Sequence, residues 1–206
     1  EQQKLTASDG RSNDRFGISV AVSGDVAAVG AYWDDVGAYT NQGSAYVFVR
    51  SGTTWSEPQK LTASNGSGDD AFGVSVSVSG DTAVVGANWD DDAEGSAYVF
   101  VKSGAVWGGQ QKLTASDGAV DDLFGISVAV SGDTAVVGAY LDDVGANTDQ
   151  GSAYVFVRSG TTWSQQQRLT ASDGAANDQF GLSVSVSGDT AVVGAYLDGV
   201  GTNAGQ

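Results

Sequence analysis

The chain is built from four copies of one sequence unit. The dipeptide Phe-Gly occurs at Phe16, Phe72, Phe124 and Phe180, spaced by 56, 52 and 56 residues. Each copy continues with a Val/Ser alternation, Ser-Gly-Asp and an apolar run ending in Gly-Ala. A period near 50 residues that holds several short strands is typical of radial or stacked β architecture, because one such unit cannot bury both faces of its sheet alone. We therefore expect one repeat domain over residues 1–206.

Each unit carries the pattern of four strands. In the third copy, residues 124–131 alternate large apolar residues with Ser or Ala, and residues 134–139 form a second apolar run after a Ser-Gly-Asp turn. Residues 151–158 alternate aromatic with small apolar residues, and residues 163–171 are more polar. Small residues replace charges on the second face of the first strand, so we expect that strand to be buried on both sides, and we expect the second strand to be buried as well. The pattern predicts an all-β fold of four-stranded antiparallel blades, of the β-propeller type and without helices.

Several motifs of the unit resemble those of a known family. These are Gln-Lys-Leu-Thr-Ala-Ser-Asp-Gly, Phe-Gly, Ser-Gly-Asp-Thr-Ala-Val-Val-Gly-Ala and Gly-Ser-Ala-Tyr-Val-Phe. Together they resemble the bacterial FG-GAP repeat, a relative of the repeats in integrin α-chain β-propellers. The resemblance implies propeller blades, often in rings of about seven, in secreted or cell-surface proteins that recognise other molecules. The integrin-type calcium loop between the first two strands is absent, so the resemblance does not carry calcium binding to that turn.

Charge and composition exclude several functions. The net charge is −16, and nine Lys and Arg residues are scattered singly, which argues against binding to nucleic acid or anionic membrane. No apolar run is long enough to insert into a bilayer. Without His and Cys the chain has no Ser-His-Asp triad, thiolate nucleophile or His-zinc site. Paired carboxylates could serve glycoside hydrolysis, but here they recur in every copy as scaffold features do. We expect no enzyme activity.

Two loops of each unit are rich in Asp, one before Phe-Gly and one after Gly-Ala. Clustered carboxylates suit Ca²⁺, and they define a candidate metal site at Asp117, Asp121, Asp122, Asp142 and Asp143. The equivalent acids of the other copies are Asp9, Asp14, Asp34, Asp35, Asp69, Asp70, Asp90, Asp91, Asp173 and Asp178. The alternative is that these acids are turn formers on a solvated rim, because Asp bonds its own backbone in turns without an ion. No other cofactor is indicated.

The tryptophans fall into two groups. Those at the start of the fourth strand recur, and we interpret them as packing between blades: Trp55, Trp107 and Trp163. Trp33 and Trp89 stand in the acidic loop where the later copies have Leu141 and Leu197, so the fold does not require them. An exposed Trp beside carboxylates could stack on a sugar ring or pack under the loop, and the sequence leaves both open. Trp33 and Trp89 are therefore candidate ligand-binding residues.

The two ends of the sequence fall inside a blade. Glu1 aligns with Glu57 and Gln206 with Gln42, so the last blade is incomplete and lacks a segment like Gly43 to Ser56. An unpaired strand edge is a template for pairing. Three explanations remain: a longer repetitive protein, a strand added from another subunit that links chains into a filament, and a ring completed by several chains.

These observations favour a non-catalytic extracellular protein for recognition, adhesion or surface structure. Its expected partners are a protein or glycan ligand, or further copies of itself through the open blade edge. The alternative is the propeller module of a secreted carbohydrate-active enzyme. In both cases we expect a secreted or cell-surface location.

Overall fold

The computed structural model describes residues 2–56 and 58–199, which form fifteen strands and no helix. Blade 1 contains β1 (Val20–Ser23), β2 (Val26–Ala31), β3 (Ser44–Ser51), β4 (Thr54–Trp55) and β5 (Gln59–Leu61). Blade 2 contains β6 (Ser75–Ser79), β7 (Thr82–Ala87), β8 (Ser96–Ser103) and β9 (Val106–Leu113). Blade 3 contains β10 (Ser127–Ser131), β11 (Thr134–Ala139), β12 (Ser152–Ser159) and β13 (Thr162–Leu169). Blade 4 contains β14 (Phe180–Ser187) and β15 (Thr190–Ala195).

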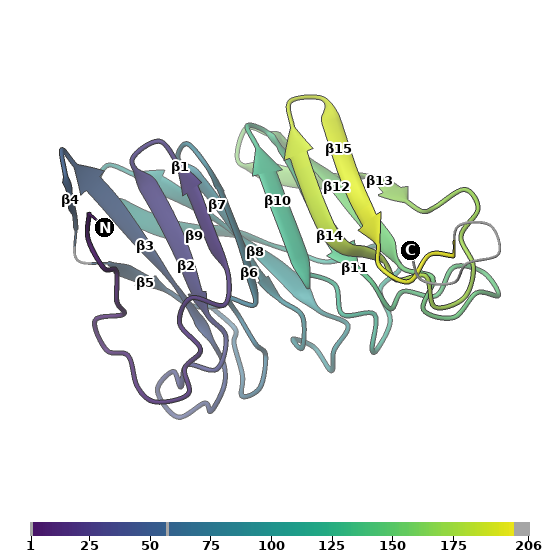
Figure 1. Ribbon diagram of the computed structural model, residues 1–206, viewed down its shortest axis with the longest axis horizontal. Coiled ribbons are helices and arrows are strands. Elements are labelled where there is room, and N and C mark those ends of the chain that lie inside the picture. The colour runs from purple at the N-terminus through teal and green to yellow at the C-terminus, as the bar shows by residue number, and fades with distance from the viewer. Residues whose placement is uncertain (1, 57, 200–206) are drawn as a thin grey trace.

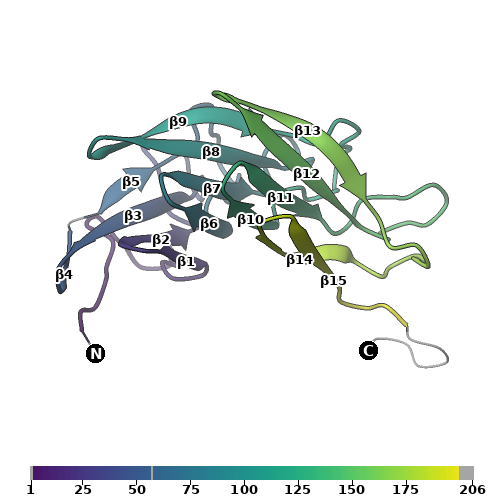
Figure 2. The same cartoon turned by 90° about the horizontal axis from the view of Figure 1, so that it is seen from above.

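Each blade is an antiparallel sheet whose strands follow chain order. The sheets stand side by side in an arc, with the first strands β1, β6, β10 and β14 on its inner side and β9 and β13 on its outer side (Figures 1 and 2). Successive first strands contact one another from blade to blade. The predicted all-β, propeller-type repeat fold is confirmed. Gln206 and Glu1, on which the alignment of the ends rests, lie outside the described residues.

Local sequence explains the strand boundaries. The Ser-Gly-Asp motif makes the tight turn between the first two strands, where Ser23 pairs with Val26 and Gly24 takes a φ of 57°. A left-handed residue at this place suits the two-residue turns that match strand twist. The fourth strand of blade 1 is split into β4 and β5, and Pro58, which has no N–H to donate, stands between them.

Burial follows the prediction for the second strand in blades 1 to 3 but not in blade 4, where the residues of β15 are exposed or half-buried, and it does not follow the prediction for the first strand of blade 1. Every residue of β2 and β7 is buried. In β1, however, Val20 and Val22 are 70% and 69% exposed, whereas the equivalent Val76 and Val78 of blade 2 are 8% and 7% exposed. The expectation of first strands buried on both sides is therefore wrong for β1, because its outward face has no neighbouring blade among the described residues.

The core lies between blades. Val26, Ala28 and Val47 of blade 1 pack against Val76 and Val78 of blade 2 in one apolar cluster, and the same arrangement recurs between blades 2 and 3. Two of the three recurring tryptophans take part as predicted, since Trp107 and Trp163 are buried in these two clusters, whereas Trp55 is half-buried and packs on the cluster of its own blade. Glutamines of the preceding unit fix the tryptophan backbones through paired amide bonds: Gln3 to Trp55, Gln59 to Trp107, and Gln111 to Trp163.

Candidate functional site

The two acidic loops of the repeat meet at one end of the blades. The loop after the second strand of one blade pairs with the Phe-Gly loop of the next. Asp69 N donates to Thr40 O at 2.9 Å, and Phe72 N donates to Gln42 O at 2.9 Å. The same pairing recurs between blades 3 and 4. Blade packing therefore gathers acids from different parts of the sequence on one loop-bearing surface.

The acid at the start of the second loop is buried and held by a cation from the fourth strand. In blade 1, Asp34 is 3% exposed, and its Oδ2 lies 2.7 Å from Lys60 Nζ and 2.9 Å from the Tyr46 hydroxyl. Lys60 also reaches Asp9 at 2.7 Å. In blade 2, Tyr98 donates to Asp90, and Lys112 lies 3.0 Å from Asp90 and 2.6 Å from Asp91.

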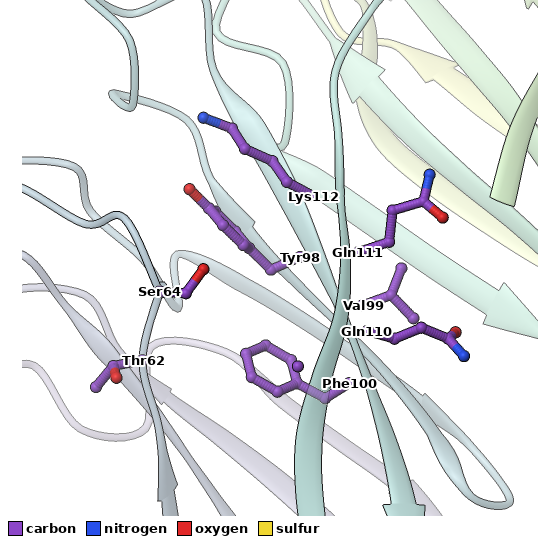
Figure 3. A pocket seen from close by; sticks show the side chains of 9 residues that line it. Thr62, Ser64, Tyr98, Val99, Phe100, Gln110, Gln111 and Lys112 are labelled. Carbon is purple, nitrogen blue, oxygen red and sulfur yellow. The ribbon is translucent and has the colours of Figure 1, made fainter. Parts of the chain in front are cut away.

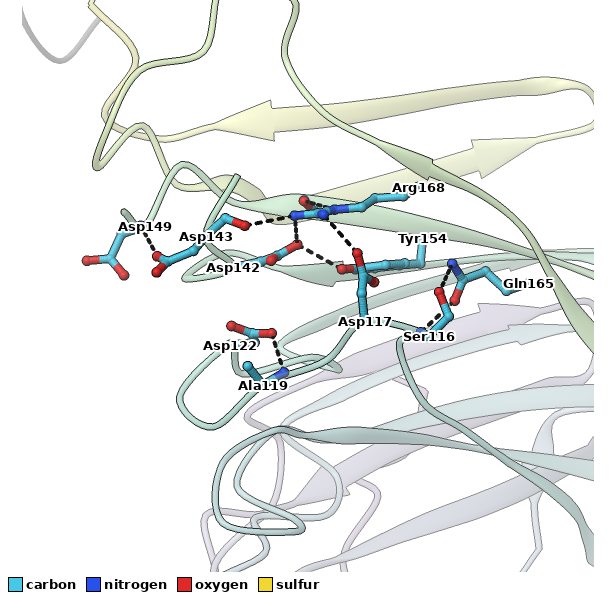
Figure 4. Close-up of polar contacts among 11 residues, drawn as sticks. Ser116, Asp117, Ala119, Asp122, Asp142, Asp143, Asp149, Tyr154, Gln165 and Arg168 are labelled. Carbon is cyan, nitrogen blue, oxygen red and sulfur yellow. Dashed lines mark hydrogen bonds and ion pairs between the residues drawn. The ribbon is translucent and has the colours of Figure 1, made fainter. Parts of the chain in front are cut away.

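Blade 3 uses an arginine in the same place (Figure 4). Arg168 of β13 donates to Asp142 at 2.6 Å and to Asp117 at 2.8 Å, and it reaches the carbonyl oxygen of Asp143 at 3.1 Å. Tyr154 of β12 donates to Asp142 at 2.8 Å. One guanidinium thus binds both acidic loops, so side chains of the protein supply the positive charge that the buried Asp142 requires.

These contacts change the ionisation of the network. Burial, followed by hydrogen bonding to Asp9 and Asp34, raises the pKa of Tyr46, so its hydroxyl keeps its proton and acts as a donor. Burial works to lower the pKa of Lys60, but hydrogen bonds to Asp34 and Asp9 outweigh it and raise that pKa. Hydrogen bonds from Lys60 and Tyr46 lower the pKa of Asp9. We call this network of Tyr46, Lys60, Asp9 and Asp34, with its equivalents in blades 2 and 3, the clamp. It joins strands to loops through charged groups, and its tyrosine stays protonated.

The acids before Phe-Gly make a local turn in every blade. Asp122 accepts from Ala119 N at 2.7 Å, and Asp178 accepts from Ala175 N at 2.6 Å. Asp70 accepts from Ser67 N in the same way, and Asp14 from Arg11 N. The residue before each of these acids has a positive φ: Asn13 (78°), Asp69 (67°), Asp121 (72°) and Asn177 (69°). Asn and Asp tolerate that conformation better than most residues, so this pattern is the one expected of turn formers.

The structure brings the five predicted metal ligands of blade 3 together around one hollow. Asp117, Asp121, Asp122, Asp142 and Asp143 all line a hollow of about 240 Å³. Burial and the charges of Asp142 and Asp143 raise the pKa of Asp122 to about 6. Nevertheless, in residues 2–56 and 58–199 no three acids are placed so that they could hold a metal ion together. Calcium binding here stays a prediction.

The equivalent acids of the other blades divide in the same way. Asp35 accepts from Asn41 N at 3.0 Å, which holds the loop after β2. The buried members of the predicted set are Asp14, Asp34, Asp70, Asp90 and Asp178. The exposed members are Asp9, Asp35, Asp69, Asp91 and Asp173. Buried members thus hold backbone, tyrosine or lysine, and three exposed members, Asp9, Asp35 and Asp91, also hold such groups from the rim.

The two predicted ligand-binding tryptophans lie around a common hollow. Trp33 of blade 1 and Trp89 of blade 2 line a space of about 430 Å³ together with Tyr32, Asn41 and Asp69. Trp33 and Trp89 are 39% and 54% exposed. Asn41 Nδ2 donates to Asp69 Oδ1 at 2.8 Å, so two polar side chains are already oriented at its edge.

Further contacts fix the walls of this hollow, hereafter the aromatic hollow. The Arg15 guanidinium lies 4.6 Å from the Trp33 ring centroid, and the Tyr32 ring centroid lies 5.1 Å from that of Trp33. Trp89 and Asp69 also line a neighbouring acidic hollow of about 560 Å³ that reaches Asp121 of blade 3. The surface is therefore aromatic between blades 1 and 2 and acidic towards blade 3.

Another hollow, of about 350 Å³, lies between the chain after β5 and strands β8 and β9 (Figure 3). Thr62 and Ser64 form one side, and Tyr98, Phe100 and Lys112 form the other. The Tyr98 hydroxyl and the Lys112 amine point to the same side in Figure 3, where they serve the clamp on Asp90. This hollow carries no acid in its lining and adjoins the clamp.

Sequence reasoning missed the residues that neutralise the acids. Lys60, Lys112 and Arg168 occupy one position of the repeat, immediately before the Leu that ends the fourth strand. Their tyrosine partners are the Tyr of each Gly-Ser-Ala-Tyr-Val-Phe motif. A basic residue recurring at a single strand position in so acidic a chain is the signal that could have found them.

The described residues include no helix able to cross a membrane.

Comparison with known proteins places the repeats in a family. The FG-GAP repeat matches residues 1–48, 55–100, 107–156 and 163–206. Among solved structures, the chain is similar to the crystal structure of the computationally designed Ika4 protein, with 16% identity and a TM-score of 0.52. That match covers 94% of this chain and 92% of the other, and at this identity it shows the fold alone. No curated protein matches the chain.

Proposed function

Because the chain belongs to the FG-GAP repeat family, we propose that it is a non-catalytic recognition module, secreted or on the cell surface, that binds a glycan at the aromatic hollow. The observation that carries the proposal is the pairing of Trp33 and Trp89 across two blades. The scaffold does not need them, since Leu141 and Leu197 occupy the equivalent positions in blades 3 and 4.

The chemistry of the hollow suits a neutral sugar. The exposed Trp89 ring offers flat apolar area to the C–H face of a pyranose, Arg15 and Tyr32 hold the Trp33 ring in place in the same hollow, and a few fixed polar groups at the edge give orientation. The Asp69 carboxylate accepts one hydrogen bond from Asn41 and has lone pairs left, so it can accept a further hydrogen bond from a sugar hydroxyl. The surrounding acids and the net charge of −16 disfavour an anionic ligand.

The same hollow supports a second candidate function, a glycan-binding propeller module within a secreted carbohydrate-active enzyme. In that case a catalytic domain adjoins these repeats in the full reading frame. For the repeats themselves we propose no catalysis. The acids of the clamp recur in each of the three blades with an outer strand, as structural features do.

Binding to a panel of neutral hexose and pentose oligosaccharides, followed by tryptophan fluorescence and calorimetry, tests the proposal. Trp33→Leu and Trp89→Leu install the residue that blades 3 and 4 already carry, so the fold should survive, and we expect each to weaken binding at least about tenfold. Tyr39→Leu is the matched control, because Tyr39 is 51% exposed and lies outside the hollow. Equal binding by the three variants, or no sugar bound by the wild type, would refute it.

A further inference from the structure

We propose that copies of this chain associate head to tail, with blade 4 of one copy packing on blade 1 of the next. The front face of a blade carries Val20 and Val22 in blade 1 and their equivalents elsewhere. The back face carries the serines of the first strand and contacts the following blade. In the described chain the front of blade 1 and the back of blade 4 lack a neighbouring blade, and together they form the two halves of one interface.

Adjacent blades are joined by a repeated set of hydrogen bonds. A serine of the first strand donates to the Phe-Gly glycine of the next blade: Ser19 to Gly73 O (2.8 Å), Ser75 to Gly125 O (2.7 Å) and Ser127 to Gly181 O (2.7 Å). A second serine accepts from the turn glycine of the next blade: Ser23 from Gly80 N (3.2 Å), Ser79 from Gly132 N (3.1 Å) and Ser131 from Gly188 N (3.1 Å). Blade 4 presents the same serines, Ser183 and Ser187, and blade 1 presents the same glycines, Gly17 and Gly24.

A glycine of the second strand allows the backbones of neighbouring blades to approach. A Cβ on Gly30, Gly86 or Gly138 would overlap the carbonyl oxygen of the next blade's Phe-Gly glycine, far inside the 3.0 Å that real Cβ atoms respect. Blade 4 has Gly194 at this place, where a Cβ would meet only Ser183 of its own blade. Among the described residues, blade 4 thus has the space at this position that blade packing requires.

The apolar parts of the two end faces also correspond. On the front side, Val20 and Val22 are 70% and 69% exposed where the equivalents in blades 2 and 3 are buried. On the back side, Val192 is 66% exposed, whereas its equivalents Val84 and Val136 are fully buried. Joining the two ends would bury these valines as the internal interfaces bury theirs, and removing their apolar surface from water favours association.

The outer part of the front of blade 1 is already covered by the chain itself. The segment 2–7 runs along the outer part of the front of blade 1, where Leu5 and Ala7 pack on its apolar cluster and Gln3 bonds Trp55. It lies there as β5 and β9 do on the following blades, whereas Val20 and Val22 on β1 stay exposed. Blade 4, for its part, consists of the two inner strands β14 and β15 among the described residues.

A second copy satisfies both ends at once. The two faces are complementary to each other and not to themselves, because serine donors are on one and carbonyl acceptors on the other, so the contact is heterologous. Repetition of such a contact closes a ring or extends a filament. Each copy carries a charge of −16, and screening of this repulsion should make association stronger at higher ionic strength.

Sedimentation of the 206-residue chain over a range of concentration and salt tests the proposal. We expect reversible association of the wild type, and at least tenfold weaker association of Val20→Asp, which blocks the front, and of Gly194→Leu, which blocks the back. Val106→Asp is the matched control, because Val106 is 61% exposed on the outer hairpin of blade 2. Circular dichroism and thermal melts check that each variant is folded, and Val22→Asp provides a second front variant.

A mixing experiment makes the test specific for head-to-tail packing. Val20→Asp keeps a working back and Gly194→Leu a working front, so equal amounts of the two should form a heterodimer that grows no further. A monomeric wild type, undiminished association of either blocked variant, or a mixture that stays monomeric would overturn the proposal. Loss of wild-type association on adding a peptide of residues 151–164 would overturn it too, because pairing at the edge of β15 would then carry the contact.

Discussion

The glycine of the second strand offers the sharpest test of how the blades pack. Gly86 lies in β7, where an added Cβ would overlap the carbonyl oxygen of Gly125 in blade 3. Its φ is not positive, so Gly86→Ala brings no backbone strain of its own. Gly194 occupies the same position in β15, where a Cβ would meet the Ser183 side chain at 2.5 Å and no following blade. The two substitutions are chemically identical and differ only in whether a blade follows.

The size of the effect follows from the overlap. To bring the Cβ of Gly86→Ala out to 3.0 Å from the carbonyl, blades 2 and 3 must separate by about 1 Å. A gap of that size forfeits a quarter to a half of the dispersion energy of the facing atoms. Overpacking of cores typically costs about 1–3 kcal/mol. We expect about 3 kcal/mol here, because the nearest obstacle is the backbone carbonyl of Gly125 and the next, the Ser75 hydroxyl, is hydrogen-bonded to that carbonyl. For Gly194→Ala the serine can turn away, and we expect a change within about 0.5 kcal/mol.

Urea unfolding followed by far-ultraviolet circular dichroism measures both values, in dilute protein so that association does not contribute. For a chain of this length, about 3 kcal/mol corresponds to a fall in melting temperature of about 6–12 °C. Equal free energies of unfolding for Gly86→Ala and the wild type would refute the close approach of the blades. A loss in Gly194→Ala as large as that in Gly86→Ala would show that the effect arises within one sheet.

Three further outcomes are expected. Arg168→Gln leaves Asp142 without its cation, so the melting temperature of this variant should fall and added Ca²⁺ should restore part of the loss; a variant that melts like the wild type, or that Ca²⁺ does not protect, would contradict this role of Arg168. The folded-state pKa of Asp122 is raised to about 6 from 3.8, so its contribution to stability is full below pH 3.8 and is lost as pH rises through about 6. Asp122→Asn should therefore flatten the dependence of the free energy of unfolding on pH over this range, and a variant with the same pH dependence as the wild type would contradict the shift. A peptide of residues 151–164 should pair with the edge of β15 and slow amide exchange there, whereas a scrambled peptide should not; equal exchange with both would exclude strand addition.

Much of the fold could be predicted because the four copies of the unit can be aligned with one another. The period, the turn at Ser-Gly-Asp and the apolar run of the second strand were enough to identify four-stranded blades. Exposure of the first strand could not be predicted the same way. Val20 and Val76 have nearly identical local sequences and opposite environments, because burial in a repeat array depends on the neighbouring blade and not on the residue itself.

The site was only partly predictable for a related reason. An Asp side chain can bind Ca²⁺, accept hydrogen bonds from the backbone of a turn, or form an ion pair with Lys or Arg. The local sequence of Asp142 does not distinguish among these roles. The role of Asp142 is decided by the cation of Arg168, which lies 26 residues later in the sequence, on β13. The tryptophans were easier to find, since a change from Trp89 to Leu141 at equivalent positions is visible without any structure.

Comparison of equivalent positions separates the scaffold from the surface free to recognise a partner. Gly86 and Gly138 are glycines because the next backbone leaves no room, and Asp90 and Asp142 are acids because a tyrosine and a cation hold them. These positions cannot vary without loss of packing or an unpaired buried charge. Trp33 and its equivalents lie in the same loops but are partly or largely exposed and take no part in the hydrogen bonds of the clamp, so substitution there leaves the clamp intact. A ligand-binding surface can therefore change blade by blade on a scaffold that stays the same, and the aromatic hollow is the place in this chain where two neighbouring blades differ from the others together.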